Sequence, residues 1–156
     1  MEFQSKRKLA AIVFTDIVGF TKLTADDQQK ASDLLDIQRN EIKPIVESHD
    51  GQWIKEMMNF VNGMSVQQQA LGKDAWTLRI GINTGPVIAG NTGNNFDIWG
   101  DAVNVAARLE SSGQEGKIQI SEKTKQFLPE NAKVTFREKV HLKNKGEMDT
   151  FFLEEI

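Results

Sequence analysis

The stretch around Asp16 could bind a metal ion and a phosphate chain. Asp16 closely follows the apolar run KLAAIVF and precedes Gly19, Phe20 and Thr21. A carboxylate beside accessible backbone amides can hold Mg²⁺ against a polyphosphate while the amides bind the phosphate oxygens. An aspartate at a strand end also commonly satisfies the amides of its own turn. Both interpretations stay open on these residues alone.

A second pair of residues has the spacing of one helix face. Asn104 and Arg108 are four residues apart in AVNVAARLESS, so on a helix they project from the same side. The arginine guanidinium is well suited to phosphate, and an asparagine one turn away could orient a sugar oxygen. An ordinary solvated helix face would explain the pair equally well.

Four further charged residues lie in strand or turn patterns. Lys55 alternates with apolar neighbours in WIKEM, where its ammonium group either reaches water past them or occupies a partly apolar pocket. Asp97 lies between two apolar residues of NFDIWG, so its carboxylate needs a donor, which any nearby lysine or amide could supply. Lys143 and Lys145 flank a turn, where lysines usually serve solubility.

The elements that must position these residues begin with a strand and a helix. The continuous apolar run KLAAIVF predicts a strand buried on both faces, ending at Asp16. After it, Thr24 or Asp26 could cap a helix whose apolar residues recur at spacings of three and four. Pro44 would bend or restart that helix, and HDGQ would form the turn after it.

The middle of the chain predicts short strands and helices in alternation. WIKEM has the period of a strand and MMNFVNGMSVQQQAL that of a helix, yet no turn residue separates Met57 from Met58. LRIGINTGPVIAG predicts two short β segments around an Asn-Thr-Gly-Pro turn. NNFDIWG predicts a strand, after which Asp101 could cap the helix that ends at Gly113.

The last third of the chain is rich in strand patterns. KIQIS and VTFREKVHL predict strands with a helical turn, TKQFL, between them, and HLK and TFFLEEI predict a hairpin joined by NKGEMD. This order of elements favours an α+β protein, with an antiparallel or mixed sheet covered by helices.

Composition limits the classes of function. The 156 residues are 39% apolar and 26% charged, which indicates one soluble domain over residues 1–156. A net charge of -3 argues against nucleic acid as a partner, and the absence of cysteine leaves oxygen or histidine as metal ligands. Without a long apolar run, we expect a cytoplasmic protein, or a domain on the cytoplasmic side of a membrane if a longer protein is anchored.

The order of the motifs is more specific than any one of them. FTDIVGFT, WIKEM, LRIGINTGPVIAG, FDIWGDAVNVAARLE and HLKNKGEMDTFFL follow one another as in class III nucleotidyl cyclase catalytic domains, which this chain resembles nearly end to end. The resemblance implies a ferredoxin-like, palm-like α+β fold that works as a head-to-tail homodimer with its sites at the interface. Regulatory domains in a longer protein would fit such a chain.

The resemblance also implies a role for each singled-out residue. It implies metal binding by Asp16 and the Ile17 carbonyl, and phosphate binding by the amides near Gly19, Phe20 and Thr21. It also implies base recognition by Lys55 and Asp97, ribose orientation by Asn104 and transition-state stabilisation by Arg108. Lys143 would bind phosphate, with Lys145 as a second cation. Two Mg²⁺ or Mn²⁺ ions are expected as cofactors.

The base-recognition pair favours ATP as the substrate. Adenine offers an acceptor at N1 and an amine donor at C6, which match a lysine donor and a carboxylate acceptor, whereas guanine reverses that pattern. By the same resemblance, guanylyl members of the family have Glu and Cys at the positions of Lys55 and Asp97, and this chain has neither. The implied reaction is attack of the ribose 3′-oxygen on the α-phosphorus, which gives cyclic AMP and pyrophosphate for intracellular signalling.

The chain departs from the family pattern at two loops. After WIKEM the family continues with a Gly-Asp-Gly-like turn that carries the second metal aspartate, which is absent near residues 57–58. The segment before Asp97, near residues 94–96, is also a few residues short. Either the printed sequence omits loop residues or the protein has lost a catalytic hairpin. We favour the first, because a true deletion would remove a sheet strand and leave the next helix uncapped.

Two other functions stay open beside adenylate cyclase activity. A true loss of the second aspartate would favour a catalytically impaired relative that binds a nucleotide or a partner for regulation. A guanylate cyclase is the nearest rival among enzymes.

Overall fold

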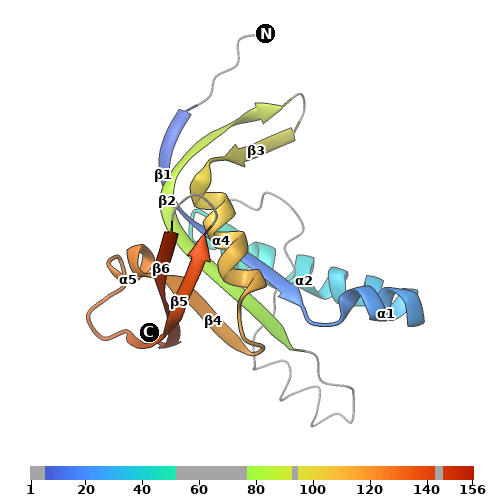
Figure 1. Cartoon of the computed structure of the whole chain (residues 1–156). Helices are drawn as coiled ribbons and strands as arrows, with labels where there is room; N and C mark the ends of the chain where they lie inside the picture. The colour runs from blue at the N-terminus through green and yellow to red at the C-terminus, as the bar shows by residue number, and fades with distance from the viewer. Residues whose placement is uncertain (1–5, 52–76, 93–94, 143–145) are drawn as a thin grey trace. The chain divides into compact units, whose positions relative to one another are not determined.

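The computed structural model describes residues 6–51, 77–92, 95–142 and 146–156, which form two compact units. One unit contains residues 1–14 and 79–156, and the other contains residues 15–78. The elements, drawn in Figure 1, are β1 (Lys6–Ile17), α1 (Phe20–Asp26), α2 (Gln28–Ser48), β2 (Leu78–Thr92), β3 (Asn95–Trp99), α4 (Asp101–Ser111), β4 (Lys117–Ser121), α5 (Glu122–Lys125), β5 (Lys133–Leu142) and β6 (Gly146–Glu155).

The described strands form a mixed, six-stranded sheet. Its order is β1-β2-β4-β6-β5, and β3 pairs with β2 outside this path. The β2 and β4 strands are parallel, whereas β4 with β6, β5 with β6, and β2 with β3 are antiparallel. This arrangement confirms the predicted α+β class with a mixed sheet and helices.

The predicted turn in the middle of β2 is wrong. Residues 78–92 form one strand that passes through the Asn-Thr-Gly-Pro segment. The β2 strand pairs with β4 through Arg79–Ile82 and with β3 through Ile88–Thr92, so Pro86 lies between these two ladders. A proline removes a ladder hydrogen bond only where its amide would have donated one. The pattern of Gly and Pro therefore did not interrupt the strand.

The C-terminal hairpin is confirmed, with longer strands than its sequence indicated. The β5 and β6 strands pair from Lys133 and Glu155 to Leu142 and Gly146, so β6 already begins within the predicted connection. The short helix between β4 and β5 begins earlier than the TKQFL pattern, because the Ser121 hydroxyl accepts from the Thr124 amide and caps α5.

The helices of the unit formed by residues 15–78 begin at other residues than the sequence indicated. Asp27 caps α2 by accepting from the Lys30 amide at 2.9 Å. Thr24 lies inside α1 and donates to the Phe20 carbonyl. The α2 helix continues through Pro44 instead of restarting there. No helix in the described part of the chain is long and apolar enough to cross a membrane.

The α4 helix packs against β2 at unusually close range. A Cβ atom added at Gly85 would lie 2.7 Å from the Ala102 Cβ, and one added at Gly81 would lie 2.6 Å from the Ala106 carbonyl oxygen. Side chains on a strand alternate between its two faces, so residues 81 and 85 share one face. The two glycines therefore let α4 lie along β2 with only small residues between the backbones.

Apolar clusters lie on both faces of the sheet. One, of Ile12, Val87, Ala102 and Ala106, includes the first half of α4, and a second, of Val105, Leu109 and Val140, includes its last two turns. A third cluster, of Ile120, Phe151 and Leu153, packs with residues that follow α5. Because Gln119 and Ile120 alternate along β4, Gln119 lies on the face that α4 covers.

Replacing Gly85 with alanine should destabilise the protein, because the new methyl group would overlap that of Ala102. We expect the free energy of unfolding, measured by urea denaturation, to fall by about 1 to 3 kcal/mol. The double variant Gly85→Ala/Ala102→Gly removes the overlap, so its loss should be smaller than the sum of the two single losses. Strictly additive losses would show that these two residues do not meet.

Gly81→Ala is the matched comparison. Its new methyl group would meet backbone atoms of Ala106 and Glu110, which no side-chain replacement can remove. Adding Ala106→Gly should therefore recover little of the stability that Gly81→Ala loses.

The pKa of Glu154 is held below its ordinary value, because Lys117 Nζ donates to its carboxylate at 2.8 Å and Thr135 donates at 3.1 Å. A lowered pKa contributes stability above the unfolded-state pKa, and this contribution disappears as the pH falls through the folded-state pKa. The Lys117→Met variant should raise the pKa of Glu154 toward its ordinary value in an NMR titration. An unchanged titration curve would exclude Lys117 as the main cause.

Candidate functional site

The α4 helix presents two of the predicted site residues on its exposed face. Asn104 and Arg108 are exposed, and Asp101 and Ser111 continue the same stripe at helical spacing. Within the described parts of the chain, the side chains of Asn104 and Arg108 make no hydrogen bond or ion pair. The opposite stripe, of Ala102, Val105, Ala106 and Leu109, is buried. One face thus fixes the helix while the other offers an amide and a guanidinium group to a ligand.

The start of α4 is set by backbone geometry and not by the predicted cap. Gly100, at φ 140°, is the cap residue that precedes the helix, and Asp101 is the first residue of the helix. Asp101 is instead an acidic residue in the first turn, where its charge is favourable to the helix dipole.

A buried polar network holds the first turn of α4 against the sheet. Asn83 donates to the Ala102 carbonyl at 3.0 Å, and Ser121 donates to the Asn83 side-chain oxygen at 2.7 Å. Thr124 lies 3.1 Å from the Ser121 hydroxyl. All three side chains are buried, so each hydrogen bond avoids the cost of an unpaired polar group. The sequence indicated none of these roles.

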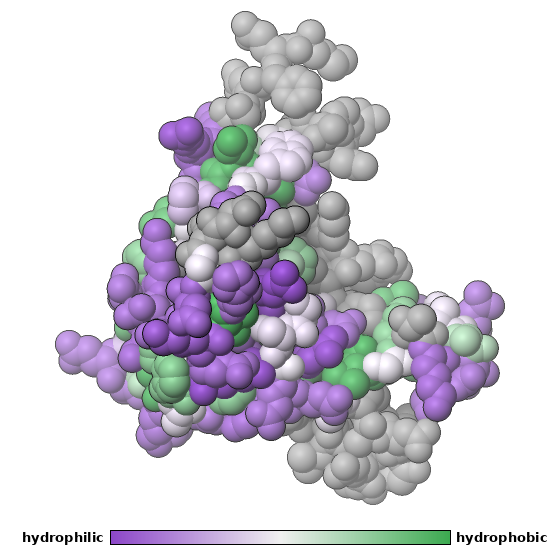
Figure 2. Space-filling view, in the orientation of Figure 1, coloured by the Kyte–Doolittle hydropathy of each residue, from purple (hydrophilic) through white to green (hydrophobic). Residues whose placement is uncertain are grey.

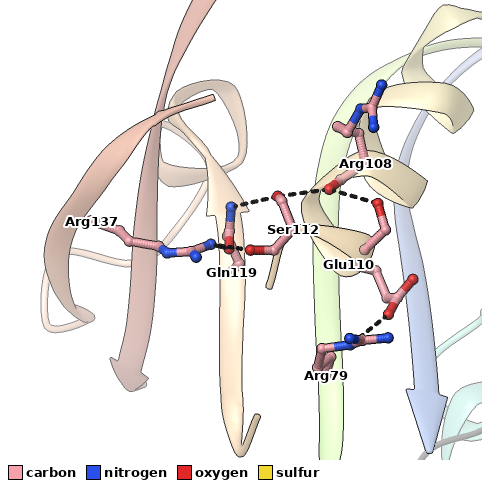
Figure 3. A network of polar contacts seen from close by, with 7 residues as sticks. Arg79, Arg108, Glu110, Ser112, Gln119 and Arg137 are labelled. Atoms are coloured by element: carbon pink, nitrogen blue, oxygen red, sulfur yellow. Dashed lines mark hydrogen bonds and ion pairs between the residues drawn. The ribbon is translucent and has the colours of Figure 1, made fainter. Parts of the chain in front are cut away.

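The end of α4 is held by a second polar network, shown in Figure 3. Arg137 on β5 donates to the Ser112 carbonyl, and Arg79 donates to Glu110 at 3.2 Å. Gln119 on β4 contacts both Arg137 and Ser112. A polar residue between the two isoleucines of KIQIS is the one sequence signal that could have drawn attention to this network.

Asp97 lies on β3, opposite Gly90 of β2. Its side chain is partly buried, and its Oδ1 accepts from the Ile98 amide at 2.9 Å. The strand to which it belongs leads directly through Gly100 into α4, so Asp97, Asn104 and Arg108 are all carried by one continuous β3–α4 segment. The structure confirms the strand and the helix, and the ligand-binding roles stay predictions.

The unit formed by residues 15–78 contains the other part of the predicted site. Asp16 is partly buried near the end of β1, and Ile17, the last residue of that strand, is buried. Gly19 has a positive φ of 79° and precedes α1, which has no side-chain cap at its start. The first residues of α1 are Phe20 and Thr21, as the sequence placed them after the strand.

The residues around Asp16 fit a hard cation that retains other ligands. In the part of the chain that the structure describes, no three acidic or histidine side chains lie together so that they could hold a metal ion. Mg²⁺ is commonly held by only one or two carboxylates, with water and substrate phosphates as its other ligands. Asp16 and the Ile17 carbonyl supply oxygen donors of the right kind for such an ion.

Three of the predicted site residues lie outside the described residues. These are Lys55, Lys143 and Lys145, and the junction of Met57 with Met58 lies outside as well. The described pairing of β2 with β3 joins Thr92 to Asn95 and Asn91 to Phe96, so it includes part of the segment near residues 94–96 that was predicted to be short.

The surface over α4 and β5 is mostly hydrophilic (Figure 2). This agrees with the exposed polar stripe of α4 and with β5, where Arg137, Glu138 and Lys139 follow one another. Such a surface suits a charged, water-soluble ligand better than an apolar one.

The chain matches a family model. Residues 55–155 match the adenylate and guanylate cyclase catalytic domain. The matched range contains Lys55, Asp97, Asn104 and Arg108 and begins after Asp16.

Curated relatives extend the similarity to most of the chain. Adenylate cyclases of Mycobacterium bovis and Mycobacterium tuberculosis are 32% identical over 174 aligned residues, which cover 92% of this chain and 39% of each relative. The chain thus spans well under half the length of these relatives. The alignment is longer than the 156 residues of this chain, so each relative has residues that this chain lacks.

Solved structures share the fold. The adenylyl cyclase CyaB from Pseudomonas aeruginosa superposes with a TM-score of 0.81 at 24% identity, covering 98% of this chain and 97% of that one. The guanylate cyclase domain of RhGC from Catenaria anguillulae, in complex with GTP, gives a TM-score of 0.79 at 23% identity, covering 96% of this chain and 98% of that one.

The match to the family model covers more than half of the sequence, and the fold agrees with those of the solved relatives. The chain therefore belongs to the family of adenylate and guanylate cyclase catalytic domains.

Proposed function

We propose that this domain is an adenylate cyclase, which converts ATP to 3′,5′-cyclic AMP and pyrophosphate in intracellular signalling. The observation that carries the proposal is the α4 helix, whose buried face is fixed on β2 while Asn104 and Arg108 project from the exposed face. The family match and the names of the mycobacterial relatives support it.

The proposed reaction forms a bond from the ribose 3′-oxygen to the α-phosphorus and breaks the bond to the oxygen that leaves with pyrophosphate. The 3′-hydroxyl loses its proton, which is released to water, and negative charge develops on the phosphoryl oxygens. Arg108 would stabilise this charge with its guanidinium group, and Asn104, one turn away, would orient the ribose. Positioning and charge stabilisation supply most of the rate in such transfers.

Asp16 and the Ile17 carbonyl would hold the metal ions, and the amides near Gly19, Phe20 and Thr21 would bind phosphate oxygens. Two bound Mg²⁺ or Mn²⁺ ions would make the 3′-hydroxyl more acidic and neutralise the triphosphate. Lys143 and Lys145 would add positive charge near the phosphates.

The choice of ATP depends on Lys55 and Asp97. A lysine can only donate and a carboxylate can only accept, and these match the acceptor and donor of the adenine edge. The mycobacterial relatives are named adenylate cyclases, whereas the RhGC domain was solved with GTP, so GTP is the rival substrate to test.

We further propose that the active form is a head-to-tail homodimer. In this arrangement Asp16 of one chain and Lys55, Asp97, Asn104 and Arg108 of a second chain complete each site. The domain would act in the cytoplasm or on the cytoplasmic side of a membrane, under the control of regulatory domains in a longer protein.

A catalytically impaired regulatory domain is the second candidate. The specific observation in its favour is the absence of an aspartate between Met57 and Met58, where the family has its second metal ligand.

The protein should form cyclic AMP from ATP and Mn²⁺, with activity that falls more than linearly on dilution as dimers dissociate. No product from ATP or GTP at any protein concentration would favour the impaired domain.

Replacing Arg108 with alanine should lower kcat for cyclic AMP formation by about 100-fold to 1,000-fold, because one preorganised donor to the developing charge is lost. KM for ATP should change much less, since the group acts mainly in the transition state. Steady-state kinetics with ATP and Mn²⁺ measure both.

Arg7→Ala is the matched control, because Arg7 is an exposed arginine of β1 with no assigned role. It removes the same charge and should leave kcat unchanged. Equal losses in the two variants would assign the effect to net charge and contradict the role of Arg108.

The double variant Lys55→Glu/Asp97→Cys should reverse the base preference. Each mismatched group leaves a buried hydrogen-bonding partner unpaired, at a cost of about 1 to 3 kcal/mol. We therefore expect kcat/KM for ATP to fall and kcat/KM for GTP to rise relative to it. Unchanged discrimination between the nucleotides would show that these two residues do not read the base.

A further inference from the structure

Gln119 is a fully buried polar side chain in the middle of β4, with a relative exposure of 0%. Its neighbours Ile118 and Ile120 face the other side of the sheet, in the cluster that includes Phe151. A buried amide needs partners for both its oxygen and its nitrogen, since each unpaired group costs free energy. Gln119 finds them in Arg137 and in Ser112, the residue that follows α4.

Arg137 connects β5 to the end of α4. Its Nη1 donates to the Ser112 carbonyl at 2.6 Å and to the Gln119 side-chain oxygen. Its guanidinium carbon lies 5.3 Å from the centre of the Phe152 ring, which adds a cation–π contact. Figure 3 shows the guanidinium group of Arg137 pointing toward Gln119 and Ser112.

The position of Arg137 satisfies two needs of a helix end. The last carbonyls of a helix lack partners within the helix, and the helix dipole places partial negative charge there. The guanidinium group supplies both a donor and a positive charge. Both hydrogen bonds come from Nη1, and the rigid, planar guanidinium group fixes the directions of its hydrogens, whereas the ammonium group of a lysine rotates freely.

The network reaches the backbone of Arg108 itself. Ser112 donates its hydroxyl to the Arg108 carbonyl at 2.8 Å, and Ser111 donates to the same oxygen at 3.2 Å. The Gln119 amide nitrogen lies 3.4 Å from the Ser112 hydroxyl. A continuous path of hydrogen bonds therefore runs from Arg137 through Gln119 and Ser112 to the backbone of Arg108.

We propose that Arg137 is a positioning residue, which holds the last turn of α4 so that Arg108 is placed for the phosphoryl transfer. This inference rests on the proposed cyclase function for its catalytic part. Arg137 does not touch the substrate in this account, and it acts only through the α4 backbone. Gln119 takes part in holding the end of α4, because its buried side chain contacts both Arg137 and Ser112.

The first test is hydrogen exchange, which needs no enzymatic activity. The amides of Ser112 and Gly113 donate to the carbonyls of Arg108 and Glu110, at 3.0 and 2.8 Å. In the Arg137→Ala variant these two amides should exchange faster than in the wild type, while amides of β4 and β6 keep their rates. Unchanged exchange at the end of α4 would overturn the proposal.

The second test is kinetic. A small displacement of a catalytic group can cost up to about 100-fold in rate, so Arg137→Ala should lower kcat by about 10-fold to 100-fold. KM for ATP should stay within about threefold, because the ground-state contacts remain. Arg137→Lys, which keeps the charge but loses the rigid planar geometry of the guanidinium group, should have an intermediate kcat. In an Arg108→Ala background the replacement of Arg137 should have little further effect, since interacting residues are not additive.

Two controls separate positioning from stability. Glu138→Gln removes the 3.0 Å ion pair with Arg137 but leaves the contacts to Ser112 and Gln119, so kcat should be unchanged. Ile120→Val, on the other face of β4, should lower stability by about 0.5 to 1.5 kcal/mol and leave kcat unchanged below its melting temperature. A kcat for Arg137→Ala that falls only with the folded fraction would contradict the proposal.

The two proposals can fail separately. If the wild-type protein forms no cyclic nucleotide, the proposed function is wrong, and hydrogen exchange alone decides whether Arg137 holds α4. If the wild type is active and Arg137→Ala keeps its full kcat, Arg137 is not a positioning residue.

Discussion

The close approach of α4 to β2 is the constraint on which the candidate site depends. A helix can lie this near a strand only where the strand has no side chain, and Gly81 and Gly85 provide two such positions on one face. The buried stripe of α4 is correspondingly small at Ala102 and Ala106. Because the interface is packed to van der Waals contact, the rotation of the helix is fixed. This rotation decides that Asn104 and Arg108 face outward.

Hydrogen bonds hold both ends of the α4 helix, in addition to its packing against β2. Asn83, Ser121 and Thr124 satisfy the first turn of α4, and Arg137, Gln119 and Ser112 satisfy its end. Both networks are largely buried, where a satisfied hydrogen bond adds little net stability but an unsatisfied one is costly. They therefore act chiefly by excluding other placements of the helix. A helix held at both ends can present a guanidinium group at a defined position, which phosphoryl transfer requires.

Local sequence patterns predicted the elements better than their boundaries. The exposed spacing of Asn104 and Arg108, the β3 strand and the C-terminal hairpin follow from periodicity alone. The errors occurred where tertiary pairing changed the meaning of a residue. Pro86 looked like a turn residue, yet it lies between two ladders of one strand. Asp101 looked like a cap, yet Gly100 has the backbone geometry that begins α4.

The order of motifs in the sequence determined the family, the mixed α+β fold and the residues to examine, because each motif keeps its residue types and spacing along the chain. Only the tertiary structure decided which neighbours hold those residues. Gly81, Gly85 and Arg137 carry no local signal of their roles, since each acts through a contact with a residue far away in the sequence. The only local signal of Gln119 is its place between two isoleucines, which does not reveal its partner Arg137. Arg137 and Ser112 are 25 residues apart and meet only because β5 and the end of α4 are brought together by the sheet.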